Sequence, residues 1–152
     1  MKKEHLFPVL RILVGALFVY TGYVKLLEPP SQLAGVILSY RILTISSANL
    51  AANIIPWVEL IAGVFFITGL YLRQAMFFLW FLNAIFAVAV AWVIFHKIPI
   101  KDCGCFGEAV KNWPIGGTLT LDLALFALFL AFFFSFQSLK HFSLDRRFEK
   151  NK

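Results

Sequence analysis

The two cysteines of this chain, Cys103 and Cys105, are separated only by Gly104. A disulfide stabilises a fold chiefly by closing a long loop of the unfolded chain, and a bond across a single residue closes almost none. Gly104 permits the tight turn that would bring the sulfurs together, although so small a ring strains the bond. Because strained, exposed disulfides tend to be oxidising and exchangeable, the spacing favours a redox pair over a structural cross-link.

Metal binding is an alternative use of the same residues, because two thiolates and His96 could hold a soft ion such as Cu(I). A closed zinc site needs four ligands, and of the three histidines only His96 is close in sequence to the cysteines. We therefore expect no metal site. His96 is more simply a polar residue at a membrane interface, or a support for the cysteine pair.

The composition predicts that these residues belong to a membrane protein. Of the 152 residues, 61% are hydrophobic and 14% are charged, whereas soluble domains have roughly 45–50% and 25%. A helix needs about 20 apolar residues to cross a bilayer, and the chain offers four such stretches. We predict spans at residues 6–26, 54–72, 74–95 and 118–139 within a single domain.

The segment between the first two predicted spans, residues 31–53, is only partly apolar and contains Arg41. That composition suits an interfacial or re-entrant segment better than a fifth span. The expected fold class is therefore all-α, a polytopic membrane four-helix bundle with this segment between spans one and two.

Basic residues predict the orientation, because cytoplasmic loops carry an excess of Lys and Arg. The formal charge of +6 comes mainly from the ends of the predicted spans, so it gives no reason to expect nucleic-acid binding. The termini and the turn at Arg73 share nine basic residues, against five on the other side. We expect an integral protein of a bacterial-type inner membrane, with cytoplasmic termini and an extracytoplasmic cysteine loop at residues 96–117.

Two carboxylates fall within predicted spans. Glu59 follows Pro56 and Asp122 follows Thr118, so we expect both in the opening turns of their helices, in the same half of the membrane as Lys25 and Arg41. Acidic residues near helix starts complement the helix dipole, which is one reading. Ionisable groups inside a membrane also mark functional paths, so a proton route or support for the redox site is the other.

Two further features of the spans have simpler interpretations. Asn83 lies near the middle of the third predicted span, where we expect an interhelical hydrogen bond. The 18 phenylalanines would suit a quinone ring, but packing against lipid and within the core explains them with fewer assumptions.

Residues 11–134 resemble the MauE/DoxX group of small four-helix membrane proteins. The cysteine motif resembles that of the MauE branch, and Asp122 falls where that branch often carries Asp or Asn after an Arg, although Leu121 replaces the Arg here. The remaining matching positions are Arg11, Gly15, Phe18, Gly22, Lys25, Leu26, Tyr40, Pro56, Glu59, Gly63 and Gly69.

The resemblance implies membrane redox chemistry, because MauE proteins are implicated in handling disulfides of an extracytoplasmic dehydrogenase subunit and DoxX relatives are linked to sulfur or quinone chemistry. Together with the cysteine spacing it predicts a thiol-disulfide oxidoreductase. Cys103 and Cys105 would exchange disulfides with an extracytoplasmic thioredoxin-like or cysteine-rich protein. The supporting residues would be Glu59, Asp122, Lys25, Tyr40, Arg11 and His96.

No tightly bound cofactor is expected, although quinone is a candidate electron partner. Two other classes of function remain open. The chain could be a non-catalytic membrane anchor or assembly factor for a redox partner, or it could carry a metal or another small solute.

Overall fold

The computed structural model describes residues 3–98 and 115–135, which form five helices. Four of these helices are long and apolar enough to cross a membrane, and α2 is a short helix between the first two of them. The predicted all-helical fold with four spans is therefore confirmed. The helices are α1 (Lys3–Leu27), α2 (Pro30–Ser39), α3 (Ile45–Thr68), α4 (Leu72–Phe95) and α5 (Ile115–Phe134).

The second span begins earlier than the sequence predicted, at Ile45 instead of residue 54. Thr44 and Ser47 start the helix, with the Thr44 N–H donating to Ser47 Oγ at 3.1 Å. Pro56 is accommodated inside the helix instead of opening it. Glu59 therefore lies past the middle of α3, and its predicted place in the opening turns is wrong.

The fourth span also starts earlier, because α5 begins at Ile115. Asp122 consequently lies about two turns into its helix instead of at the opening. The segment of residues 31–53 divides between α2 and the first turns of α3. It is helical over most of its length.

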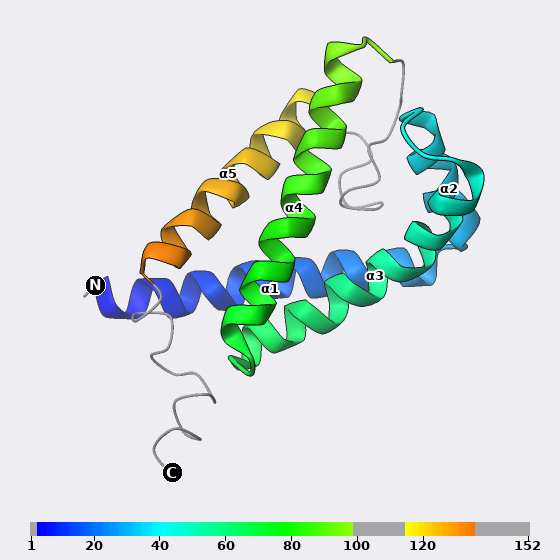
Figure 1. The fold of residues 1–152 in the computed structure, drawn as a ribbon. Helices are drawn as coiled ribbons and strands as arrows, with labels where there is room; N and C mark the ends of the chain where they lie inside the picture. Colours follow the sequence, from blue (N-terminus) through cyan, green and yellow to red (C-terminus); the bar gives the residue numbers. More distant parts are fainter. Residues whose placement is uncertain (1–2, 99–114, 136–152) are drawn as a thin grey trace.

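The spans pack as two crossed pairs (Figure 1). Antiparallel α1 and α3 lie side by side and make the most extensive contact in the described bundle, and α4 pairs with α5 while also touching α3. Aromatic side chains fill the crossing, where the Phe66 ring lies 6.0 Å from that of Phe129 and 5.9 Å from that of Phe132. This core fixes the rotation of each helix and therefore which side chains meet inside.

Glycines allow α1 and α3 to approach closely. A Cβ added to Gly22 would lie 2.9 Å from both the Pro56 carbonyl oxygen and the Leu60 nitrogen, and one added to Gly63 would lie 3.0 Å from the Val19 nitrogen. Such distances to backbone atoms leave no room for a side chain. Small residues at these positions let the two backbones touch, as is common between membrane helices.

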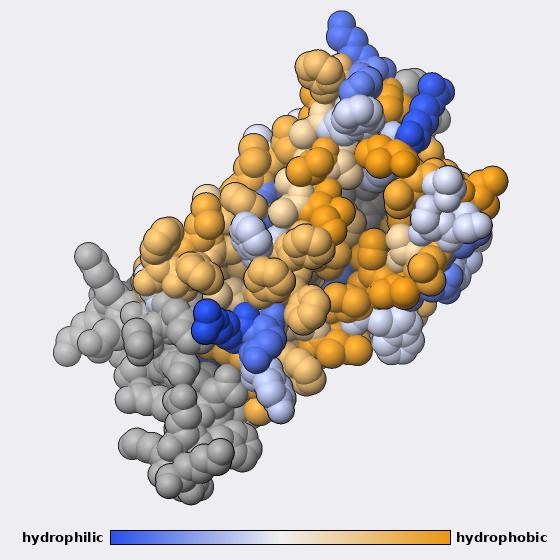
Figure 2. All heavy atoms as spheres, viewed as in Figure 1, coloured by the Kyte–Doolittle hydropathy of each residue, from blue (hydrophilic) through white to orange (hydrophobic). Residues whose placement is uncertain are grey.

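The outer surface of the bundle is largely apolar, and Figure 2 shows hydrophobic residues across the middle with hydrophilic ones gathered toward the ends. Large apolar side chains from every span are exposed, among them Leu13, Val64, Val88 and Phe133. In water so extensive an apolar surface would drive association, whereas in a bilayer it contacts lipid. The chain is therefore an integral membrane protein.

Candidate functional site

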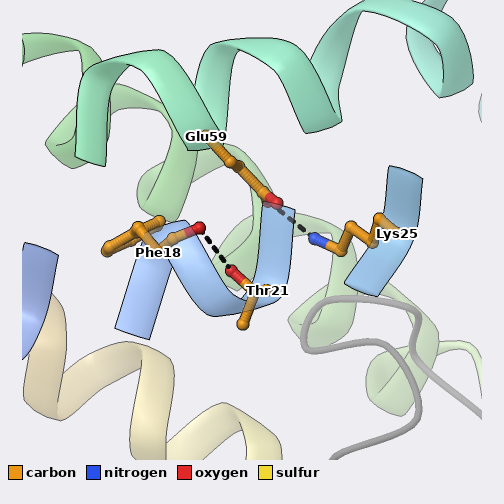
Figure 3. A network of polar contacts seen from close by, with 4 residues as sticks. All are labelled: Phe18, Thr21, Lys25 and Glu59. Atoms are coloured by element: carbon orange, nitrogen blue, oxygen red, sulfur yellow. Dashed lines mark hydrogen bonds and ion pairs between the residues drawn. The ribbon is translucent and has the colours of Figure 1, made fainter. Parts of the chain in front are cut away.

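A buried ion pair joins α1 to α3. Lys25 Nζ lies 2.6 Å from Glu59 Oε1, and the two side chains are only 2% and 1% exposed. Figure 3 shows the two side chains pointing toward one another from facing helices. Removing two charges from water is costly, so each of these buried charges needs the other to neutralise it.

The two partners of the ion pair have different surroundings. Lys25 Nζ lies 4.9 Å from the centroid of the Phe86 ring on α4, a favourable position for a cation over an aromatic face. Thr21, one turn before Lys25, donates its hydroxyl hydrogen to the Phe18 carbonyl oxygen at 3.1 Å, so this hydroxyl is hydrogen-bonded within α1 (Figure 3). Within the described part of the chain, Glu59 Oε2 is buried and has no hydrogen-bond partner. The carboxylate thus keeps one oxygen available for a proton or a further donor.

A second polar contact joins α4 to α5 and confirms the interhelical hydrogen bond predicted for Asn83. Its Nδ2 donates to the backbone carbonyl oxygen of Asp122 at 2.9 Å, and both residues are buried. Asn83 and Phe86 are three residues apart and so share one face of α4. That face therefore contacts the ion pair on one side and the Asp122 backbone on the other.

Arg11 lies far from the ion pair, although the sequence grouped it with the supporting residues. Its Nη2 donates to the Ile67 carbonyl oxygen at 3.2 Å, close to the end of α3, where Gly69 is left-handed with φ 73°. Fourteen residues of α1, about 21 Å, separate it from Lys25. A cation at a helix carboxyl end stabilises that end, so the observed contact gives Arg11 a role in holding α1 against α3.

The other predicted supporting residues occupy different places. Tyr40 is buried and ends α2, its backbone N–H donating to the Ile37 carbonyl oxygen at 3.3 Å. His96 is exposed at the end of α4, with its ring centroid 3.8 Å from that of Trp92. Arg41 is also exposed.

Cys103 and Cys105 lie outside the described residues. Among the residues that are described, the structure brings Lys25 together with Glu59 and Asn83 together with the Asp122 backbone. In residues 3–98 and 115–135 it shows no group of three or more His, Cys, Asp or Glu side chains that could hold a metal ion. The sequence analysis did not identify Phe86 as a neighbour of the polar residues. Its position three residues after Asn83, on the same face of α4, could have indicated this.

Sequence comparison places this arrangement in a known family. The chain matches the family of methylamine utilisation protein MauE over residues 3–136, which is most of its length. The chain belongs to the MauE family. This MauE-family protein is also 25% identical over 142 residues to Protein TlpB of Flavobacterium psychrophilum. The match covers 88% of this chain but spans only 38% of TlpB. No solved structure matches the chain.

The Asn83 contact leads to a stability prediction for this MauE-family bundle. Replacing Asn83 with leucine should lower the free energy of unfolding by about 0.5–1.5 kcal/mol, the range for hydrogen bonds between membrane helices. The measurement is unfolding by SDS titration in mild detergent. Asn53 is the matched control, because it is exposed and its Nδ2 bonds only to the Asn49 carbonyl of its own helix. Equal effects of Asn83→Leu and Asn53→Leu would show that the interhelical bond contributes nothing.

Proposed function

We propose that this MauE-family protein is a membrane thiol-disulfide oxidoreductase. The observation that carries the proposal is the Cys103-Gly104-Cys105 sequence in the segment that joins α4 to α5. A bond across one residue contributes little to stability, so exchange chemistry explains the pair better than cross-linking does. The distribution of basic residues predicts that this segment lies outside the cytoplasm. The partner that we propose for it is an extracytoplasmic thioredoxin-like or cysteine-rich protein.

The proposed exchange proceeds through a mixed disulfide. A thiolate of the pair attacks one sulfur of the partner's disulfide, which forms a bond between the proteins and releases the partner's other sulfur as a thiolate. The second cysteine of the pair then displaces the first partner sulfur. The products are a Cys103–Cys105 disulfide and a partner dithiol that has gained two electrons and two protons. The reverse sequence oxidises the partner.

The positions of the buried polar residues support a part for them in the accompanying proton transfers. Phe86, which faces Lys25, lies nine residues before Phe95, or about 13 Å from the end of α4. Asp122 lies seven residues after Ile115, or about 10 Å from the start of α5. These are the helix ends that the cysteine segment joins. Glu59, the partner of Lys25, has a carboxylate oxygen available to accept a proton.

The electrons need a further partner if the protein turns over repeatedly as an oxidant. A quinone dissolved in the bilayer is the partner that we propose, because it takes up two electrons and two protons when the cysteine pair is reoxidised. This step requires the quinone to reach the sulfur atoms directly. Adding a short-chain quinone to reduced protein in detergent should therefore restore the disulfide.

The test of the proposed function is exchange with a reduced or oxidised thioredoxin-like substrate in proteoliposomes, followed by thiol alkylation on gels. The double variant Cys103→Ser, Cys105→Ser should lower the exchange rate to background. The single variant that keeps the attacking cysteine should trap a mixed disulfide that reducing agent releases, and the other single variant should not, which identifies the attacking residue. Full exchange by the double variant would overturn the proposal, provided that its helical content and elution match those of the wild type.

A membrane anchor or assembly factor is the second candidate. It is favoured by the match to TlpB, which covers most of this chain but only 38% of that protein, as expected of a bundle that can serve as one part of a larger protein. Coexpression with a partner separates the two candidates. Partner maturation that survives loss of both cysteines, but fails when Gly22 is enlarged, would favour anchoring.

A further inference from the structure

A lateral groove of about 730 Å³ lies between the amino end of α4 and the carboxyl end of α5. The two ribbons diverge toward this end in Figure 1. The volume of the groove is within the range of small-molecule binding sites, roughly 300–1,000 Å³. The groove lining includes Arg73, Phe77, Trp80, Phe129, Leu130 and Phe133.

The polar and apolar parts of the groove are separated along the helix axis. Arg73 and Gln74 lie in the first turn of α4, at the very end of its membrane span. The remaining side chains of the wall are aromatic or aliphatic, and they extend about 10 Å deeper, to Trp80. An occupant must therefore have an anionic or acceptor-rich head at the membrane surface and an apolar body below it.

We propose that the groove binds an anionic phospholipid, with its phosphate on Arg73 and an acyl chain along Phe77, Phe129 and Phe133. A guanidinium binds phosphate through paired charge-assisted hydrogen bonds, and basic pockets between membrane helices bind anionic headgroups.

Other occupants fit this groove less well. Trp80 lies 15 residues before Phe95, so about 22 Å of helix separates the groove from the end of α4 where the cysteine segment begins. A quinone would present only neutral carbonyl oxygens to Arg73, whereas a phospholipid presents a charged phosphate. A second copy of the chain would have to bring a carboxylate to Arg73, whereas phosphate is available all along the bilayer surface. Lipid binding in this groove does not depend on the proposed redox function.

The experiment is native mass spectrometry of the full chain titrated with phosphatidylglycerol or phosphatidylcholine. Wild-type protein should retain phosphatidylglycerol about tenfold more tightly than phosphatidylcholine. Both lipids carry a phosphate, but the ammonium group of phosphatidylcholine competes with the Arg73 guanidinium for it. Arg73→Gln should remove this preference. Lys97→Gln, which removes an exposed cation at the other end of α4, should leave it intact. Leu130→Trp, which fills the groove, should weaken retention of both lipids.

Three outcomes would overturn the proposal. The first is an undiminished preference for phosphatidylglycerol in Arg73→Gln. The second is a loss of this preference in Lys97→Gln as large as that in Arg73→Gln, which would indicate a general charge effect. The third is another occupant of the groove, either a co-purifying quinone that Leu130→Trp displaces or a dimer whose chains cross-link through Phe133→Cys. If a variant cannot be purified, the melting temperature of the wild-type protein in nanodiscs is measured instead. There the anionic lipid should raise Tm by several degrees over the zwitterionic one, and equal Tm values would contradict the site.

Discussion

Replacing Glu59 with leucine while Lys25 remains should lower the free energy of unfolding by about 3–5 kcal/mol. The substitution leaves the buried Lys25 ammonium group without its carboxylate. Among the described residues, the Phe86 ring still faces this cation, but a ring is a much weaker partner than a carboxylate. Lys25→Met should be similarly damaging, because the Glu59 carboxylate would then lose the hydrogen bond that its buried Oε1 now accepts. SDS titration of purified protein in mild detergent measures both effects.

The double variant Lys25→Met, Glu59→Leu should recover most of the lost stability. Hydrophobic residues of similar volume replace a buried ion pair at little cost, and often with a gain. Glu28→Leu is the control, since Glu28 is only half-buried and lies at the end of α1. If the double variant loses the sum of the two single effects, the residues do not stabilise the fold through their mutual contact.

The double variant also separates stability from function. A folded bundle without this ion pair should retain the cysteine segment but lack the carboxylate that we propose for proton transfer. We expect its disulfide exchange to slow while its helical content stays unchanged. Disulfide exchange at the wild-type rate would show that the Lys25–Glu59 pair serves the structure and not the reaction.

Adding a single methyl group at Gly22 should destabilise the bundle by about 1–3 kcal/mol. The new Cβ of Gly22→Ala would lie 2.9 Å from two backbone atoms of α3 and 3.1 Å from the Glu59 Cβ. Backbone atoms in a helix cannot move individually, so α1 and α3 must separate. Because Gly22 is three residues before Lys25, the separation should also lengthen the ion pair.

Gly35 provides the matched control for this substitution. It lies in α2, and a Cβ added there would meet nothing within 4 Å. Gly35→Ala should therefore be neutral or stabilise by up to about 1 kcal/mol, because alanine favours a helix over glycine. Thermal unfolding of the two variants under the same detergent conditions makes the comparison. Similar destabilisation by both would contradict close packing of α1 on α3.

The number and type of the helices could be predicted from the sequence because hydropathy is a local property. A run of about 20 apolar residues must satisfy its backbone hydrogen bonds internally once it is in lipid, so it forms a helix whatever its neighbours are. The same local argument predicted that Asn83, a polar residue in such a run, would bond to another helix. Its acceptor, the Asp122 carbonyl, was not predictable.

The start of α3 shows where local reasoning failed. Pro56 favours the first turn of a helix, but it does not prevent a helix from starting earlier when Thr44 and Ser47 provide a start. Glu59 was therefore placed correctly inside the second span but at the wrong depth. The polar composition of residues 44–53 concealed the beginning of a helix that extends through them.

The sequence by itself determined that this protein is a four-span membrane bundle with a cysteine pair between its last two spans. Only the tertiary structure decided that Lys25 meets Glu59, a residue 34 positions away, while Arg11 binds the end of α3 and Arg41 stays exposed. The physical reason is that pairing depends on the rotation and separation of whole helices. Contacts such as that of Gly22 with Pro56 set both, and no single segment of the sequence contains that information.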